Sequence, residues 1–590
     1  MRFELLNKEN THYDDITRVF VNRGIKPEEI SHYCNVTADD ENDPMLLDQM
    51  SDGAKMLVRH IKAMDETALL VDCDCDGFTS AAVLYNYLWK LFPNWVEPHL
   101  HWLIHEDKEH GLADKVDSII ESGAKFVIVP DAGGGDKDHV ARLVEKGIEV
   151  LFLDHHDATV ESYGDCVVIN NQHGNYPNRT LSGVGVVYKF CQYFGKLLGT
   201  TSGGERFDPS YLLDLVAVGC VADLMPLTNY ETLYYIRYGI SHLYNPFLKA
   251  VAQLQEYSIT KHGGFDPFVI GFYFAPLINA TIRVGTESEK QFLFMALLER
   301  YGYEDVPSTK RGHKGELESR AEQAARMCSN VRTRQNKLRD TQLARIEELI
   351  QEQYSYAAPL VTVMIEPEEN MDKNILGLIA NILMDEYQRP ILLLNHNRED
   401  HTWAGSVRNY PYFPIRDLRA FLEAQEGVVY ASGHPSAFGI CIKEGDLTGF
   451  VEQVGDELDE IDTDPLYYVD YIFEANNVDG QVILDIAECN SLYGQAFTEP
   501  YVAVTNIVCD SNNTQLLSKD KHPTIKITLP DGTAIMKFGS SEEEYNQLVK
   551  EDKVVTISVV GTCAANFWAG VTTPQIMVKD YEITSEVWDF

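Results

Sequence analysis

The first third of the chain alternates short apolar runs with longer segments of mixed polarity. Three runs, at residues 68–71, 126–129 and 150–153, contain only apolar side chains and are typical of buried strands. The segments between them, around 78–92, 112–122 and 138–147, have helical patterns. Alternating strands and helices build right-handed βαβ units. We therefore predict an open α/β fold with a parallel sheet.

The middle of the chain changes to a different pattern. From about residue 310 to 352 the sequence lacks proline and is dense in Glu, Arg, Gln, Ala and Leu, which predicts a long connector helix. A second α/β segment is expected to follow and to end near residue 445. Its strands should lie near 360–365 and 391–395, around a helix at 374–388.

The last part of the chain reads as a separate β region. Residues 452–464 carry seven acids and no base, which favours a solvated linker over a structural element. Beyond this linker, short strands separated by turn residues predict a small β-barrel. The expected domains are residues 1–308, a connector at 309–355, a second α/β domain at 356–450, an acidic linker at 451–465 and a barrel at 466–590.

Charge and cysteine content narrow the functional classes. The 590 residues carry a formal net charge of -41, which disfavours a protein that coats DNA or binds an anionic membrane. Any contact with nucleic acid must therefore be local. Residues 310–345 contain ten bases and four acids, whereas residues 466–590 have a net charge of -11. The eleven cysteines contain no C-x-x-C pair, and no apolar run approaches ~20 residues, so we expect a cytoplasmic, reduced protein without a membrane span.

Carboxylates follow the predicted strands. Asp72, Asp74 and Asp76 alternate directly after the first strand, and Asp131 ends the second. Like charges this close need a counter-charge, which divalent cations with oxygen and nitrogen ligands can supply. On its own, D-x-D-x-D-G is equally consistent with a calcium loop or a polar turn. The interleaved residues 73 and 75 are cysteines, which should point to the opposite side and fill the core.

Two further segments add candidate ligands. Asp154, His155 and His156 end the third strand, and Asp223 lies inside an apolar stretch. A lone acid in apolar surroundings needs a partner or a metal. Adjacent histidines at a strand end can also be one surface and one capping residue, so this pair alone does not decide the chemistry.

Taken together and in this order, these motifs resemble the DHH phosphoesterase superfamily, and within it the RecJ-type exonucleases. The first domain would then be the DHH domain, the second the DHH-associated domain, and the barrel an OB-like oligonucleotide-binding domain. The resemblance covers nearly the whole chain. It is carried by D-x-D-x-D-G at 72–77, D-x-G at 131–133, D-H-H at 154–156, L-S-G-V-G at 181–185, V-A-D-x-x-P-L at 221–227, G-S-V-R at 405–408, S-G-H-P-S-A-F-G at 432–439 and N-F-W-A-G at 566–570.

The resemblance implies a metal-dependent, single-strand-specific DNA exonuclease. Such an enzyme works 5′ to 3′, releases 5′-mononucleotides by two-metal hydrolysis, and serves DNA repair, recombination or replication. The implied cofactors are two divalent cations, Mn²⁺ preferred or Mg²⁺. The family's ligands map onto Asp74, Asp76, Asp131, His155 and Asp223, with Asp131 as the bridge and Asp72 as a nearby candidate.

The resemblance also implies catalytic and substrate-binding residues. His156 is assigned to the scissile phosphate, and Asp154 to orienting its neighbours. Asn279 and Arg283 resemble the family's I-N-A-x-G-R-x-G, with Arg283 a candidate for the 5′ end, although Ile282 replaces a glycine of that pattern. The candidate phosphate contacts of the second domain are Ser406, Arg408, Gly433 and His434.

The acidic barrel fits this picture least well. Phe538, Phe567 and Trp568 could stack on bases, but aromatics of small barrels more often fill the core, and we expect the latter. With its net charge of -11, the barrel is better suited to docking a protein partner than to binding DNA.

Two other functions stay open. One is a DHH phosphodiesterase for short oligonucleotides or cyclic dinucleotides, which would need neither the connector nor the barrel. The other is a replication scaffold that has lost catalysis, against which the intact ligand set argues.

Overall fold

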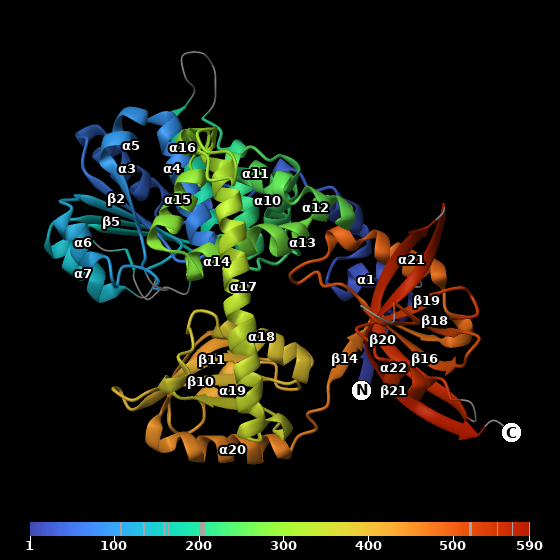
Figure 1. Ribbon diagram of the computed structural model, residues 1–590. Helices are drawn as coiled ribbons and strands as arrows, with labels where there is room; N and C mark the ends of the chain where they lie inside the picture. Colours follow the sequence, from blue (N-terminus) through green and yellow to red (C-terminus); the bar gives the residue numbers. More distant parts are fainter. Residues whose placement is uncertain are drawn as a thin grey trace. The chain divides into compact units, whose positions relative to one another are not determined.

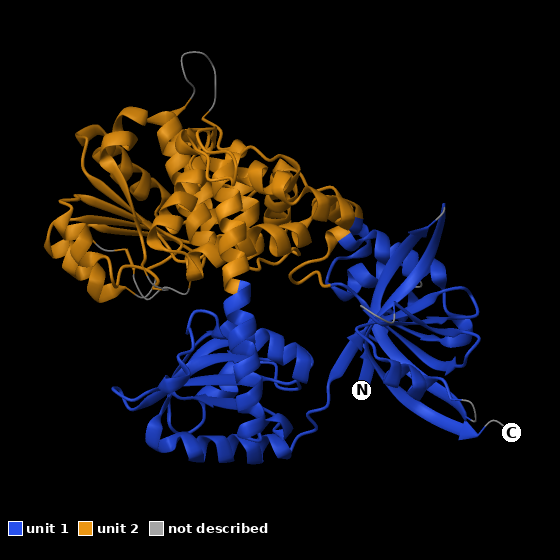
Figure 2. Cartoon of the chain, in the orientation of Figure 1, with its two compact units in different colours: residues 1–30, 336–490, 499–590 blue, residues 31–335, 491–498 orange. Residues whose placement is uncertain are grey.

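The chain divides into two compact units, which are coloured separately in Figure 2. Unit 1 comprises Met1–Ile30, Asn336–Asn490 and Glu499–Phe590, and unit 2 comprises Ser31–Gln335 and Ser491–Thr498. This computed structural model describes residues 1–13, 15–106, 109–133, 136–156, 161–162, 164–199, 207–518, 522–550, 553–568 and 570–588.

Unit 2 is built on a five-stranded parallel sheet with the order β3-β2-β4-β5-β6 (Figure 1). The three apolar runs form its central strands, which confirms the predicted parallel α/β fold, and β3 and β6 are additional strands on either side. The strands are β2 (Thr67–Val71), β3 (Leu100–Ile104), β4 (Phe126–Pro130), β5 (Glu149–Asp154) and β6 (Cys166–Asn170).

Helices cover both faces of this sheet. Alternate side chains of β2, β4 and β5, such as Leu70, Val129 and Phe152, form one buried cluster with apolar residues of α6 and α7. On the other face, Gly53 of α3 lies against Ile169 of β6 and Leu151 of β5. The helices are α3 (Met50–Ala63), α4 (Cys75–Leu91), α6 (Val116–Glu121), α7 (Lys137–Glu145) and α8 (Gly183–Leu198), with α5 (Pro93–His99) leading into β3.

The rest of unit 2 is a helical layer. One stretch of it, Pro267–Val284, is long and apolar enough to cross a membrane by length and composition, and 56% of it is buried within the protein. Core helices pass the same test, so this is weak evidence for a span. The helices are α9 (Leu213–Ala222), α10 (Tyr230–Ser241), α11 (Pro246–Leu254), α12 (Glu256–His262), α13 (Pro267–Val269), α14 (Ala275–Val284), α15 (Glu287–Leu297) and α16 (Glu299–Gly302).

The predicted connector is a single helix, α17, but it begins later than expected. It spans Arg320–Glu352, whereas the preceding residues form a short antiparallel pair, β7 (Asp305–Pro307) with β8 (Leu317–Ser319). Gly312 and Gly315 between these strands adopt positive φ angles of 87° and 94°, which a helix does not allow.

The second α/β segment belongs to unit 1 and holds a mixed sheet with the order β12-β13-β11-β10-β9. The strands and helix predicted at 360–365, 391–395 and 374–388 are β9, β10 and α18. The bounds are β9 (Val361–Ile365), α18 (Leu376–Tyr387), β10 (Ile391–Asn397), β11 (Thr402–Arg408), α19 (Leu418–Glu423), β12 (Val428–His434), β13 (Ala437–Lys443) and α20 (Leu447–Asp459).

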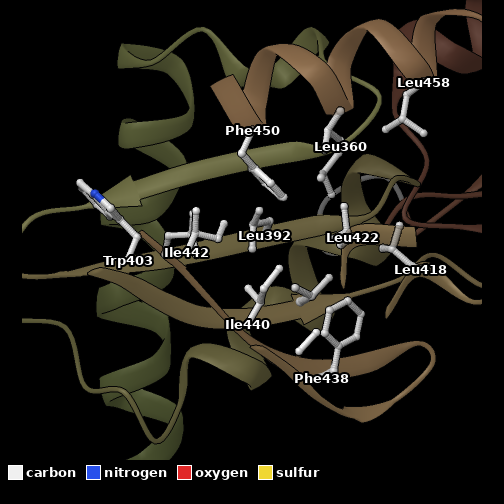
Figure 3. Packing of buried hydrophobic residues seen from close by; sticks show 14 of the residues in the cluster. Leu360, Leu392, Trp403, Leu418, Leu422, Phe438, Ile440, Ile442, Phe450 and Leu458 are labelled. Atoms are coloured by element: carbon white, nitrogen blue, oxygen red, sulfur yellow. The ribbon is translucent and has the colours of Figure 1, made fainter. Parts of the chain in front are cut away.

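Helix α20 contradicts the prediction of an unstructured acidic linker at 451–465. Its apolar residues Leu447, Phe450, Val454 and Leu458 recur with helical spacing and are buried in the core of this domain. Figure 3 shows Phe450 and Leu458 of this helix among the core side chains. The acids lie on the outer face of the helix. The high acid content of this segment therefore marks a solvent-exposed helix face and not an unstructured linker.

The C-terminal part of unit 1 is a seven-stranded sheet with the order β15-β16-β20-β21-β19-β18-β17. Among the described residues, the outer strands β15 and β17 do not pair with each other, so closure into an OB-like barrel stays a prediction. The strands are β15 (Tyr471–Glu474), β16 (Tyr501–Cys509), β17 (Thr514–Leu517), β18 (Thr524–Thr528), β19 (Ala534–Phe538), β20 (Lys553–Trp568) and β21 (Val571–Trp588), with helices α21 (Gly480–Glu488) and α22 (Glu542–Leu548).

The first residues of the chain belong to unit 1 and pack with its C-terminal part. Strand β1 (Arg2–Leu5) pairs in parallel with β14 (Leu466–Val469), and Arg23 forms a buried ion pair with Asp470 at 2.9 Å. The sequence instead predicts one first domain at residues 1–308 that includes these residues as an N-terminal extension. Sequence patterns describe local structure and cannot reveal a partner this far along the chain.

Three aromatic residues of the C-terminal sheet lie outside its core. Phe538, Phe567 and Trp568 are 58%, 73% and 79% exposed, which contradicts the expectation of core packing. Phe567 and Trp568 lie near the turn between the two longest strands, β20 and β21, where the hairpin pairs with no third strand among the described residues. Ala569, part of the N-F-W-A-G motif, lies outside the described residues.

Candidate active site

The predicted carboxylates gather where the strand order of the unit 2 sheet reverses. The chain leaves β2 toward β3 on one side and later returns to β4 on the other, so the crevice between the ends of β2 and β4 is the switch point of the sheet. Ligands of open α/β sheets bind in such a crevice. Asp72 follows β2, Asp131 follows β4 and Asp154 ends β5.

The first motif turns directly into helix α4, which fixes two of its aspartates. Asp74 caps the helix and accepts a hydrogen bond from the N–H of Gly77 at 2.9 Å. Asp76 lies in the first turn, is 3% exposed, and accepts hydrogen bonds from the N–H groups of Gly183 and Val184 at 2.8 and 3.2 Å. These donors are at the N-terminus of α8, where the helix dipole favours a negative charge.

Asp131 occupies an unusual backbone position. Its φ is 60°, in the left-handed region. Apart from glycine, only short polar residues adopt this region readily. Its N–H donates to the carbonyl of Leu153 at 2.9 Å, which holds the turn against β5, and its side chain is buried. Local strain of this kind clusters at functional sites.

The side chains of the D-H-H motif have two roles: one histidine faces the other carboxylates, and the aspartate orients both histidines. Oδ1 of Asp154 accepts the N–H of His155 at 2.8 Å and lies 2.8 Å from Nδ1 of His156, so this buried carboxylate orients both histidines. Nε2 of His155 points at the other carboxylates, 3.2 Å from Oδ1 of Asp131 and 3.5 Å from Oδ2 of Asp223. Asp223 follows the last residue of α9.

The electrostatics of the cluster call for a cation. Burial, together with repulsion from Asp74, raises the pKa of Asp76 to about 7. Burial and Asp76 likewise raise the pKa of Asp223 to about 7 and that of Asp131 well above its ordinary value. Burial lowers the pKa of His155. Every one of these shifts disfavours the charged form, so the group is electrostatically unfavourable without a counter-charge.

Three candidate ligand atoms are unsatisfied in the described part of the chain. Oδ1 of Asp131, Nε2 of His155 and Oδ2 of Asp223 are buried and have no hydrogen-bond partner in the part of the chain that the structure describes. The ligand atoms fall into sets of three within 4.8 Å of one another, among them Asp76 with His155 and Asp223, and Asp72 with Asp74 and Asp131. This oxygen-rich donor set fits hard divalent cations such as Mn²⁺ or Mg²⁺.

Glycines make room for these carboxylates. A Cβ atom on Gly183 would lie 2.1 Å from Oδ1 of Asp131, one on Gly219 would lie 2.5 Å from Oδ1 of Asp76, and one on Gly77 would lie 2.5 Å from Cβ of Asp72. No side chain fits at such distances. Each carboxylate is therefore held against a backbone surface that only glycine provides.

The other candidate of unit 2 lies on helix α14. Asn279 and Arg283 are one turn apart and half-buried, and Arg283 is close enough to Asp74 to interact electrostatically. Burial lowers the pKa of Arg283, although Asp74 opposes this shift. Ile282, which replaces a family glycine, is buried, so this departure adds to the core instead of opening the loop.

The four candidates of the second α/β segment lie on β11 and β12, the two strands that flank β13 in the mixed sheet of unit 1. Arg408 is opposite Ala437, which is opposite His434, and Ser406 is opposite Gly439 on the same face. Opposed residues of an antiparallel pair project to the same side, so Arg408, His434 and Ser406 share one face. Gly433 has a φ of 128°, which only glycine adopts readily.

The basic charge of the connector is partly neutralised by acids of the same units. Arg326 pairs with Glu318 at 2.6 Å, Arg334 with Glu289 at 2.8 Å, and Arg345 with Glu369 at 2.8 Å. Hydrogen bonds from Arg326 lower the pKa of Glu318 to about 2. Several of the bases at 310–345 therefore hold the helix to the rest of the fold.

Sequence reasoning missed the histidines that follow β3. Nδ1 of His110 lies 2.6 Å from Oδ2 of Asp72, whose Oδ1 accepts the N–H of Gly111 at 3.0 Å. His105 is fully buried and its Nδ1 lies 2.7 Å from Oδ1 of Asp114. Recognition of β3 would have indicated them, because its end meets the same edge of the sheet.

Comparison with known proteins agrees with this geometry. The model of the DHH family, N-terminal domain, matches residues 67–220. The prophage-derived single-strand DNA-specific exonuclease YorK of Bacillus subtilis is 31% identical over 587 residues, which is 99% of this chain and 98% of YorK. The single-stranded-DNA-specific exonuclease RecJ of the same organism is 25% identical over 96% of this chain and 68% of RecJ.

A solved structure extends the comparison to the fold. RecJ from Thermus thermophilus in complex with Mn²⁺ matches with a TM-score of 0.69 at 17% identity, over 98% of this chain and 79% of that one. The full-length similarity to YorK and the match to the DHH model identify the family. This chain belongs to the RecJ-like single-strand DNA-specific exonucleases of the DHH superfamily.

Proposed function

We propose that this protein is a metal-dependent exonuclease that degrades single-stranded DNA from its 5′ end and releases 5′-mononucleotides. One observation carries the proposal above all. Side chains from five separate elements converge on the switch point of the unit 2 sheet, and three of their buried ligand atoms have no hydrogen-bond partner within the described chain. The names of the relatives YorK and RecJ support single-stranded DNA as the substrate and an exonuclease as the activity.

Asp74, Asp76, Asp131, His155 and Asp223 would hold two divalent cations, with Asp131 between them and Asp72 nearby. Two divalent cations balance the charge of four carboxylates, so an incoming phosphodiester meets little net repulsion. When bound, the cations supply the Lewis acidity that activates the phosphodiester and the attacking water. The set of Asp72, Asp74 and Asp131 contains only oxygen donors, and the set of Asp76, His155 and Asp223 adds one imidazole, which suits Mn²⁺ or Mg²⁺.

His156 would bind the scissile phosphate. Its side chain is 55% exposed at the rim of the carboxylate cluster, and its hydrogen bond with Asp154 raises its pKa to about 9. The imidazole is therefore protonated at neutral pH. Because Nδ1 is directed at Asp154, Nε2 presents a charged donor to a phosphate oxygen.

The remaining candidates would position the strand. Arg283, half-buried near Asp74, would pair with the terminal 5′-phosphate and so set the direction of cleavage. Arg408, Ser406 and His434 would contact backbone phosphates, with Gly433 allowing close approach. Contacts of this kind position a strand without reading its sequence.

We further propose a cytoplasmic role in DNA repair, recombination or replication, with a protein partner docked on the acidic C-terminal sheet. The exposed Phe567 and Trp568 offer an apolar contact for such a partner, and the net charge of this region favours a basic one.

The decisive experiment follows the earliest products from a linear single strand labelled at either end, with Mn²⁺ present. The expected result is immediate release of labelled mononucleotide from the 5′-labelled strand only, with a circular strand left intact. Early loss of the 3′ label or nicking of the circle would overturn the direction. A dinucleotide cleaved faster than the long strand would favour a short-oligonucleotide phosphodiesterase.

Two variants connect this activity to the site. Asp131→Ala removes the proposed bridging carboxylate and should abolish cleavage while the circular dichroism spectrum stays parental. Asp165→Ala removes an exposed carboxylate just before β6 of the same sheet and is the matched control. If Asp131→Ala still binds two equivalents of Mn²⁺ in calorimetry and cleaves at the parental rate, the assignment of the bridge is wrong.

A further inference from the structure

A thiol and an imidazole meet beside the carboxylate cluster, in a place that the proposed reaction does not use. Sγ of Cys73 lies 3.5 Å from Nε2 and 3.6 Å from Nδ1 of His110. Together with Asp72 they offer one ligand atom each within 4.8 Å of one another. Cys73 is buried, whereas the His110 side chain is 54% exposed, so the group opens to solvent through the imidazole.

The spacing of the two softer ligands matches a small tetrahedral cation. With a Zn–S bond of ~2.3 Å and a Zn–N bond of ~2.0–2.1 Å, a tetrahedral zinc ion holds sulfur and nitrogen about 3.5 Å apart. The observed distance from Sγ of Cys73 to Nε2 of His110 is 3.5 Å, and Sγ lies almost equally near Nδ1, at 3.6 Å. The exposed imidazole must therefore turn to direct Nε2 at an ion shared with Sγ. Nδ1 of His110 lies 2.6 Å from Oδ2 of Asp72. A carboxylate behind a ligating histidine is the usual arrangement in metal sites.

A second histidine points into the same place. His105 is 1% exposed, and its Nε2 has no hydrogen-bond partner among the described residues. This atom lies 4.0 Å from Oδ1 of Asp72. Nδ1 of His105 donates to Oδ1 of Asp114 at 2.7 Å, which leaves the lone pair on Nε2. A buried imidazole lone pair next to a carboxylate, with no hydrogen-bond donor between them, favours the binding of a cation.

We propose that Cys73 and His110, with Asp72 and His105 beside them, form a second site, next to the carboxylate cluster and sharing Asp72 with it, for a thiophilic divalent cation of the zinc class. It goes beyond the proposed nuclease function, whose cations are hard and whose ligands include no sulfur. Thiolate and imidazole select zinc-class ions, whereas carboxylate clusters select Mn²⁺ and Mg²⁺. Binding converts the Cys73 thiol to a thiolate and releases one proton to the buffer.

The test uses Co²⁺ as the probe, added to the full-length protein in the presence of excess Mg²⁺. A cobalt ion with a thiolate ligand shows a sulfur-to-metal charge-transfer absorption, which a cobalt ion among carboxylates lacks. The expected result is one equivalent of this absorption, and its loss when Zn²⁺ is added. The absorption should disappear in Cys73→Ser and persist in Cys34→Ser, which removes an exposed cysteine.

Two further variants keep the test informative if Cys73→Ser does not fold. His110→Ala changes a side chain that is more than half exposed, and Asp114→Asn changes the residue behind His105. Each should weaken Co²⁺ binding by about tenfold or more. Absence of the absorption in the parental protein, its persistence in Cys73→Ser, or parental affinity in His110→Ala would each overturn the proposal.

Discussion

Replacement of Gly183 by alanine tests whether the carboxylate cluster is held as rigidly as its packing indicates. The new Cβ would lie 2.1 Å from Oδ1, 2.5 Å from Cγ and 2.6 Å from Cβ of Asp131. Real Cβ contacts are essentially never shorter than 3.0 Å, so the carboxylate must move by about 1 Å. The variant thus displaces a proposed ligand without changing any ligand's identity.

The expected effect is a loss of activity with little loss of stability. A misplacement of about 1 Å at a catalytic group can reduce the rate by about 100-fold, which corresponds to about 2.7 kcal/mol of transition-state stabilisation. Affinity for Mn²⁺ should fall by about 10- to 100-fold. Gly183 begins helix α8 and has no positive φ, so alanine itself favours the helix there by up to about 1 kcal/mol.

Gly455 provides the matched control. It lies in helix α20, and a Cβ atom at this position would meet no other atom within 4 Å. Gly455→Ala should keep parental activity and unfold at an equal or higher urea concentration. Calorimetric Mn²⁺ titration and single-turnover cleavage of a labelled single strand measure both variants. Parental metal affinity and rate in Gly183→Ala would refute the idea that Asp131 is a rigidly placed ligand.

Three further predictions concern substrate binding and stability. Arg408→Ala should weaken single-strand binding by about 1.5–3 kcal/mol, as expected for one charge-assisted phosphate contact. The single-turnover rate at saturating DNA should stay near parental. A collapse of that rate at unchanged affinity would instead show that Arg408 stabilises the transition state. Trp568→Ala should change DNA affinity in fluorescence anisotropy by less than about 1 kcal/mol, because the C-terminal region is acidic; a larger loss would indicate base stacking. Lys189→Ala should lower the free energy of unfolding in urea by about 3–5 kcal/mol, since it removes the cation 3.2 Å from the buried carboxylate of Glu231, which keeps only neutral donors such as Tyr176; a change below about 1 kcal/mol would contradict this.

Much of the site could be predicted because its signals are local. Each central strand of the sheet is an uninterrupted apolar run that ends in an aspartate, and parallel strands bring such ends to one edge. The edge strand β3 escaped notice because His101 is exposed and interrupts the apolar pattern. Because β3 was missed, the histidines that follow it, which the structure places against Asp72, were missed as well.

The errors arose where composition was read without geometry. The acids at 452–464 outnumber the apolar residues, but the helical spacing of Phe450, Val454 and Leu458 decides the structure. The bases at 310–345 have acidic partners, such as Glu289 for Arg334, that no local pattern reveals. Trp568 is exposed because of its place near a hairpin turn, which depends on strand pairing and not on residue type.

The pairing of β1 with β14 has a consequence for biosynthesis. Arg2 donates a hydrogen bond to the carbonyl of Asp462, which is 460 residues further along the chain. At a translation rate of about 5–20 residues per second, roughly 20 to 90 seconds pass before the ribosome has made the partner of the first strand. The parallel sheet of unit 2, whose strands lie between Thr67 and Asn170, can form in that interval, but β1 must wait with its edge unpaired. A chaperone that binds nascent extended segments, or a slower translation rate, should therefore influence the yield of this protein more than that of one whose first strand pairs locally.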